Sequence, residues 1–131
     1  MENGLSNIEK SELKSVVAKG DLGSVLQPLI REIHLFDSFV AGTTYLESQD
    51  VLDTLAVGNL LVLEREENKF DINAILIKTD KGIKIGYVPE KDNVIFARLM
   101  DAGKLLRGRI KSIDRRHDFS KISIGIFLVD V

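Results

Sequence analysis

The residues of this chain best suited to binding a ligand lie in one polar stretch, residues 64–73. Asn and Asp side chains form hydrogen bonds to nearby backbone and thereby shape rigid turns. A rigid polar loop that also carries an aromatic ring is a common place for a binding site. The spacing alone is equally compatible with a solvated hairpin loop. The residues concerned are Arg65, Glu66, Asn68, Phe70, Asp71 and Asn73.

Several classes of chemistry find no support in the composition. The chain has no cysteine, which excludes disulfides and thiolate metal sites. Its two histidines, His34 and His117, lie far apart, so neither a zinc site nor a Ser–His–acid arrangement can be assembled with specificity. Glycine-rich phosphate loops are absent. We therefore expect a protein that is not an enzyme and that has no cofactor.

The acidic residues of the same stretch could in principle bind a hard cation. The interleaved Arg65 and Lys69 neutralise part of that charge, so we expect no metal site. A metal-dependent nuclease or hydrolase is accordingly the weakest functional alternative. The acidic residues are Glu64, Glu66, Glu67 and Asp71.

Aromatic residues are few, which makes their positions informative. Phe39, Phe70 and Tyr87 lie at the ends of expected strands or beside turns. Exposed rings beside polar groups on a small β-domain stack on unpaired nucleic-acid bases. The alternative is that all three rings belong to the hydrophobic core.

Basic residues concentrate towards the C-terminal end, although the whole chain has a net charge of −2. Residues 37–95 contain 6 basic and 11 acidic residues, whereas residues 96–131 contain 8 basic and 4 acidic. This distribution argues against sequence-blind duplex binding but allows a local anion-binding face. Arg107, Arg109 and Lys111 alternate along one expected strand. They form either a solvated strand face, which the pattern favours, or a track for phosphates.

Residues 1–36 are predicted to form a helical N-terminal extension, with a capping box at residues 6–9 and a second helix from Ser24. The extension has too little apolar surface to stand alone. We therefore expect it to pack on the following domain or on a second copy of the chain, giving a homodimer. No segment approaches the roughly 20 apolar residues of a membrane span, and no signal peptide is recognised, so we expect a cytoplasmic protein.

Residues 37–131 are predicted to form a mainly β, α+β domain. Apolar runs between turn formers predict about six short strands, near residues 39–41, 60–63, 74–77, 83–88, 105–113 and 121–129. A single helical turn is expected at residues 51–55. A longer helix capped by Asp92 or Asn93 is expected to end at Gly103 and to bury residues 94–96, 99 and 100. The pattern favours a small, partly open antiparallel barrel with an inserted helix.

Three segments closely resemble the HIRAN domain family. They are Val40-Ala41-Gly42 with Tyr45, residues 61–75, and Ile85-Gly86-Tyr87-Val88-Pro89. Residues 63–75 follow roughly the family pattern L-x-R-E-x-x-N-x-[YF]-D-x-N-A-I. The resemblance covers about residues 38–129. It implies an OB-like barrel with inserted helices, found on DNA-repair translocases and as small stand-alone bacterial proteins.

The resemblance also implies a ligand, because the best understood relatives capture the 3′ end of single-stranded DNA. Phe70 would then flank the terminal base, and Asp71 would accept a hydrogen bond from the terminal 3′-hydroxyl. Asn68 would lie beside the same pocket, whereas Asn73 would shape the loop. Phe39 matches a stacking aromatic, and Tyr87 stands where some relatives have a histidine. The nucleic-acid-binding set that we expect is Phe39, Arg65, Asn68, Phe70, Asp71, Tyr87, Arg107 and Arg109.

The chain departs from the DNA-end-binding relatives at two positions. Ser38 stands where they carry a basic residue, and Val40 stands where they often have a second aromatic. The leading hypothesis is a non-catalytic module that binds single-stranded DNA at a 3′ end, with a link to DNA repair. The alternative is a protein-interaction module of the same fold that assembles through residues 1–36 and binds no DNA.

Overall fold

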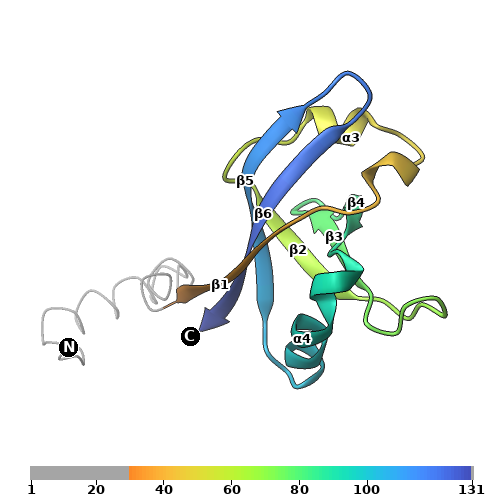
Figure 1. Ribbon diagram of the computed structural model, residues 1–131. Helices are drawn as coiled ribbons and strands as arrows, with labels where there is room; N and C mark the ends of the chain where they lie inside the picture. The colour runs from red at the N-terminus through yellow and green to blue at the C-terminus, as the bar shows by residue number, and fades with distance from the viewer. Residues whose placement is uncertain (1–29, 131) are drawn as a thin grey trace, which may run out of the picture. The chain divides into compact units, whose positions relative to one another are not determined.

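The computed structural model of the protein describes residues 30–130 and shows six strands with one longer helix between the fourth and the fifth (Figure 1). None of the helices in this part of the chain is long and apolar enough to span a membrane. The elements are β1 (Arg31–Phe39), the 3-10 turn η2 (Thr43–Tyr45), α3 (Asp50–Asp53), β2 (Leu60–Arg65), β3 (Ile75–Thr79), β4 (Lys84–Tyr87), α4 (Glu90–Asp101), β5 (Leu106–Arg115) and β6 (Ser120–Asp130).

All six strands belong to one sheet, in the order β1-β6-β5-β2-β3-β4. The neighbours from β6 to β4 pair antiparallel. Leu61 of β2 lies opposite Gly108 of β5, and Leu63 lies opposite Ile77 of β3. Consecutive side chains of a strand point to opposite faces, so this register directs Leu61 and Leu63 to the same, buried side.

The two outer strands of the sheet meet at one point. Ala41, two residues after β1, forms an isolated antiparallel bridge with Tyr87 at the end of β4. The backbone N–H of each residue donates to the carbonyl of the other, at 2.8 and 2.9 Å. A Cβ atom at Gly86 would collide with the Ala41 carbonyl, so a glycine permits this approach. The predicted six-stranded antiparallel sheet is confirmed. The predicted barrel is not closed, because this single bridge joins the outer strands within the described residues.

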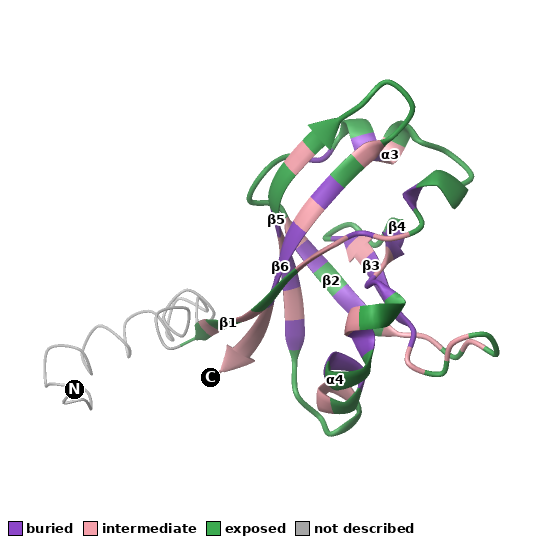
Figure 2. Cartoon of the chain, in the orientation of Figure 1, coloured by how far each residue is buried: buried purple, intermediate pink, exposed green. Residues whose placement is uncertain are grey.

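Buried residues of five strands and both helices form one hydrophobic cluster (Figure 2). Ile122, Ile124 and Ile126 face this cluster from β6, as their alternation in the sequence predicts. Leu52 contributes from the short helix α3, which corresponds to the helical turn expected at residues 51–55. The core therefore holds the sheet and the two helices together.

Helix α4 begins earlier than the sequence predicted, and part of its predicted face is buried: Phe96 lies in the core, and Leu99 and Met100 pack against it. Pro89 precedes the helix, so Asp92 and Asn93 lie in its first turn and do not cap it. Asn93, Phe96 and Ala97 are buried, whereas Ile95 is 68% exposed. Successive residues of a helix point about 100° apart, so the apolar run at residues 94–96 cannot all face one side.

Strand β1 corrects the predicted extent of the N-terminal helices, because residues 31–36 are extended. Ile30 and Ile33 have helix-like spacing, but they are 40% and 41% exposed, so this spacing did not mark a buried helical face. The Phe36 ring packs 5.6 Å from the ring of Phe96 and ties β1 to α4. The helices predicted in residues 1–29, and a dimer formed through them, lie outside the described residues.

Candidate nucleic-acid interface

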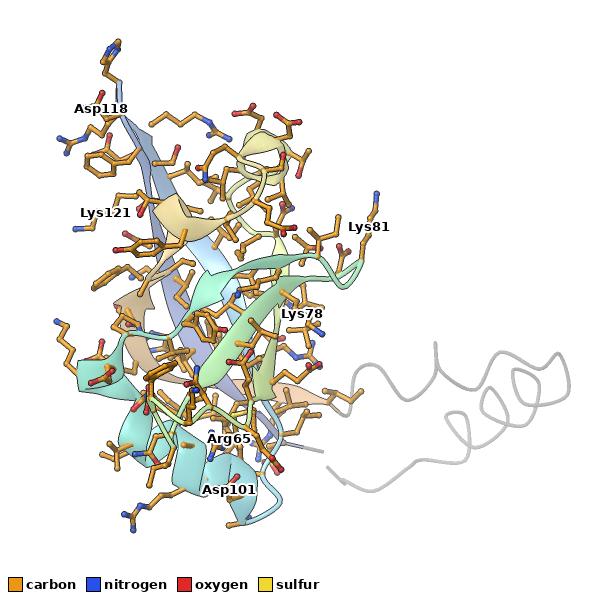
Figure 3. The ribbon with its side chains drawn as sticks, turned by 90° about the vertical axis from the view of Figure 1, so that its right-hand side faces the viewer. Arg65, Lys78, Lys81, Asp101, Asp118 and Lys121 are labelled. Carbon is orange, nitrogen blue, oxygen red and sulfur yellow. The ribbon has the colours of Figure 1, made fainter. Side chains whose placement is uncertain are left out.

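Arg65 anchors the loop of residues 66–74 to the rest of the domain. Its Nη1 donates to the Ala74 carbonyl at 2.6 Å, and its Nη2 donates to the Ile72 carbonyl at 2.9 Å. Its Nε also forms an ion pair with Asp101 at the end of α4, at 2.9 Å (Figure 3). The hydrogen bonds from Arg65 lower the pKa of Asp101. Arg65, which the sequence placed among the nucleic-acid-binding residues, therefore has its guanidinium engaged within the protein.

Two side chains shape this loop from within. The Asn68 Oδ1 accepts a hydrogen bond from the backbone N–H of Phe70 at 2.8 Å. The Asp71 Oδ1 accepts one from the backbone N–H of Asn73 at 2.9 Å. The turn leaves the Phe70 ring 85% exposed. The loop is thus the rigid polar turn that its Asn and Asp content predicts, and it presents an aromatic ring to solvent.

Asn93 fixes the remaining oxygen of the Asp71 carboxylate. Its Nδ2 donates to Asp71 Oδ2 at 2.8 Å, and the residue is only 1% exposed. Among the buried side-chain atoms of residues 30–130, the Asn93 Oδ1 is without a hydrogen-bond partner. The sequence indicated Asn93 only as a helix cap, because nothing local connects it to Asp71.

The first turn of α4 also holds the end of β1. Ser38 donates its hydroxyl hydrogen to Asp92 Oδ2 at 2.8 Å. Asp92 and Asn93 are consecutive, so this one turn binds both β1, which carries Phe39, and the loop that carries Asp71. Two predicted site residues from distant parts of the sequence are thereby tied to one short helical segment.

Tyr87 joins the same assembly from the end of β4. Its hydroxyl donates to the Glu66 carboxylate, with oxygen distances of 2.8 and 2.9 Å. Asn68 donates to the same carboxylate through Nδ2 at 3.2 Å. Glu66, which the sequence did not assign to the nucleic-acid-binding set, thus connects two residues that it did assign.

Each of the three predicted stacking rings has lysine ammonium groups near its centre. The Lys69 Nζ lies 5.2 Å from the centre of the Phe70 ring, and the Lys84 Nζ lies 4.6 Å from that of Tyr87. Two ammonium groups lie 5.8 Å from the centre of the Phe39 ring. Within the described residues, none of these lysines forms a salt bridge. The lysines at Phe39 are Lys91 and Lys121.

The basic stripe on β5 is paired with two carboxylates of β1. Glu32 accepts from Arg107 Nη1 at 3.0 Å, and its two oxygens accept from Nε and Nη2 of Arg109 at 2.8 Å each. The hydrogen bonds from Arg109 lower the pKa of Glu32. Lys111 pairs with Asp37 at 2.8 Å. The structure separates Arg107 and Arg109 from the loop assembly, and a role in phosphate binding would require them to leave Glu32.

The two histidines are not brought together with a set of metal ligands. His34 contacts Asp37 at 2.7 Å and packs its ring edge-on against Phe127, 5.3 Å away. The side chain of His117 is fully exposed. Across residues 30–130, no group of three or more His, Asp or Glu side chains could hold a metal ion.

The arrangement is suited to a single-stranded nucleic acid. Exposed aromatic faces accept bases, and free ammonium groups attract phosphates. A fixed carboxylate at Asp71 accepts a hydrogen bond from a hydroxyl and repels an anion. These three features lie on the loop, the end of β1, strand β4, the first turn of α4 and the start of β6.

Comparisons with known proteins agree with this fold. A crystal structure of a protein from Lactobacillus plantarum is similar, with a TM-score of 0.70 and 29% sequence identity over 78% of this chain and 99% of that chain. The crystal structure of the HIRAN domain of human HLTF has a TM-score of 0.61 and 17% identity over 76% of this chain and 78% of that chain, and so shares the fold. A comparison with curated proteins gives no match. The family model of the HIRAN domain matches residues 33–129, which run from β1 into β6. The chain therefore belongs to the HIRAN domain family.

Proposed function

We propose that this protein is a non-catalytic module that binds single-stranded DNA and prefers a free 3′ end. Membership of the HIRAN family supports nucleic-acid binding at the level of the family. The observation that carries the proposal is the Asp71 carboxylate, which two hydrogen bonds hold in place next to the exposed Phe70. The polarity of the end rests on the family resemblance of residues 68–71. Free 3′ ends arise in DNA repair, which would be a natural setting for such a module.

Asp71 can bind a terminal hydroxyl in spite of its two internal hydrogen bonds. An ionised carboxylate offers about four acceptor positions, of which Asn73 and Asn93 occupy two. A 3′-hydroxyl would donate to a remaining position. An internal nucleotide presents a phosphodiester there, and its negative charge is repelled. One carboxylate can therefore discriminate an end from a continuous strand.

The aromatic rings would supply affinity that is independent of base sequence. Base stacking on such rings contributes about 1–3 kcal/mol per base. Phe70 is the most accessible of the three predicted rings, and Phe39 and Tyr87 are partly buried. We propose that Phe70 flanks the terminal base, with Asn68 beside it, and that Phe39 and Tyr87 contact the strand on the other side of the site.

The proposal is tested by fluorescence anisotropy at low salt, with two oligothymidylates that differ only in a 3′-hydroxyl or a 3′-phosphate. We expect the wild-type protein to bind the hydroxyl end more tightly. Asp71→Ala should bring the two affinities together. Asp118→Ala is the matched control, because it removes the same charge from an exposed carboxyl in the β5–β6 loop (Figure 3). Equal affinities of the wild-type protein for both oligonucleotides would refute end preference.

A further inference from the structure

A hollow of about 440 Å³ lies beside Phe39, within the range of roughly 300–1,000 Å³ typical of ligand sites. Three elements each contribute a lysine to its lining: Lys91 from α4, Lys111 from β5 and Lys121 from β6. Ser38, Ser112 and Ser123 also line the hollow, together with Asp37 and Asp92. The hollow is therefore lined by polar and apolar groups together, and Phe36 and Phe39 are its aromatic residues.

The lysines of this hollow differ in whether their charge is neutralised. Lys111 pairs with Asp37 at 2.8 Å. Lys91 and Lys121 form no salt bridge among the described residues, although Lys121 lies opposite Asp114 in the β5–β6 register. Each Nζ lies 5.8 Å from the centre of the Phe39 ring. Asp92 accepts the hydroxyl hydrogen of Ser38. Two ammonium groups that no salt bridge holds thus flank one partly exposed ring.

Lys91 and Lys121 differ in this respect from the two arginines of β5. Arg107 and Arg109 both bind Glu32, and each would lose that partner on binding a phosphate. A cation near an exposed aromatic ring gains only about 0.5–1 kcal/mol, so Lys91 and Lys121 remain available for an anion. A lysine also adapts to a phosphate more easily than a paired arginine, because its ammonium is a point charge on a flexible stem.

Ser38, at which the chain departs from the DNA-end-binding relatives, also lines the hollow. The DNA-end-binding relatives carry a basic residue there, whereas the Ser38 hydroxyl is bound to Asp92. Lys91 lines the same hollow as Ser38 and lies 5.8 Å from the centre of the neighbouring Phe39 ring. Lys121 approaches the same ring from β6.

We propose that Lys91 and Lys121 form a phosphate-binding subsite, which holds the phosphodiester groups that precede the terminal nucleotide of a bound strand. This subsite would supply the positive charge that is absent at Ser38. It rests on the proposed binding of single-stranded DNA and extends the ligand path from the loop across Phe39 towards β6. A base stacked on Phe39 carries its backbone past both ammonium groups.

The test compares two double variants that remove the same charge. Lys91→Gln with Lys121→Gln alters the subsite, whereas Lys81→Gln with Lys104→Gln alters two lysines without a salt bridge in the described part of the chain. Lys81 lies in the turn after β3, on the opposite side of the domain from Lys121 (Figure 3). Anisotropy titrations with the hydroxyl-ended and phosphate-ended oligothymidylates are repeated over a range of salt concentrations.

We expect the subsite variant to reduce the slope of log Kd against log salt by about 1.4, at about 0.7 for each lost contact with a single strand. Between about 50 and 200 mM salt, its affinity should fall about sevenfold less than that of the control variant. The ratio of affinities for the two ends should not change. Equal slopes for the two variants, with end preference retained, would overturn the subsite alone. No binding of either oligonucleotide by the wild-type protein would overturn the subsite and the proposed function together.

Discussion

Asn93→Leu should weaken end preference while leaving the fold nearly as stable as before. Asn93 is 1% exposed and donates one hydrogen bond to the Asp71 carboxylate, at 2.8 Å. Leucine has a similar size but cannot donate. Asp71 would then keep only its bond to the backbone of Asn73, and its carboxylate could rotate away from a terminal hydroxyl.

The expected stability change is small because two effects oppose each other. Losing a hydrogen bond to a charged group costs about 1.5–3 kcal/mol. The Asn93 Oδ1, however, is buried without a partner among the described atoms, and such an atom destabilises a fold by about 1–3 kcal/mol. Leucine removes both atoms, so we expect a net change in unfolding free energy within about 1 kcal/mol.

Urea denaturation measures this change, and anisotropy with the two oligothymidylates measures the ratio of affinities for the two ends. We expect that ratio to fall several-fold towards one. Ala97→Ser is a suitable control, because it introduces a small polar change at a buried position of the same helix without touching Asp71. A loss above about 3 kcal/mol would show that Oδ1 has a partner, and an unchanged ratio would show that Asn93 does not position Asp71.

Three further substitutions test the scaffold. Glu32→Gln should cost about 0.5 kcal/mol at neutral pH, a value kept low because Arg109 is 39% exposed. Arg109 lowers the pKa of Glu32 below its usual 4.5, so the ion pair stabilises the fold at pH values above 4.5. The stability difference between Glu32→Gln and the wild-type protein should therefore vanish as the pH falls through the lowered pKa. Urea midpoints of the two proteins that differ equally at all pH values would contradict this. Arg65→Met should free residues 66–74 and speed their cleavage in limited proteolysis, and cleavage at the wild-type rate would show that Arg65 does not anchor the loop. Gly86→Ala should destabilise the fold by about 1–3 kcal/mol, because the new Cβ atom would collide with the Ala41 carbonyl. An unchanged urea midpoint would mean that the backbone at the Ala41–Tyr87 bridge can shift to admit the Cβ atom without a loss of stability.

Strands β2 to β6 and the loop were predictable because their determinants are local. The alternation of Ile122, Ile124 and Ile126 identified β6 and its buried face. The loop was predictable for the same reason, since the hydrogen bonds of Asn68 and Asp71 reach only two residues along the chain. The motif of the HIRAN family lies in this locally determined part of the sequence.

The errors arose where distant residues decided the outcome. Ile30 and Ile33 have helix-like spacing, but β1 forms because it pairs with β6, which is the last strand of the chain. Ile95 was assigned to the buried face of α4, yet the position of the helix against the sheet buries Asn93 in its place. Neither the pairing of two distant strands nor the packing of a helix against a sheet leaves a signal in the local pattern of apolar residues.

Sequence by itself determined strands β2 to β6, the shape of the loop and the family. Tertiary structure decided which charges are available to a ligand. Arg109 is paired with Glu32 across a separation of 77 residues, whereas Lys91 and Lys121 meet at Phe39 and form no salt bridge in the described part of the chain. The physical reason is that an ion pair depends on the distance between two groups in space, and only the folded sheet sets that distance.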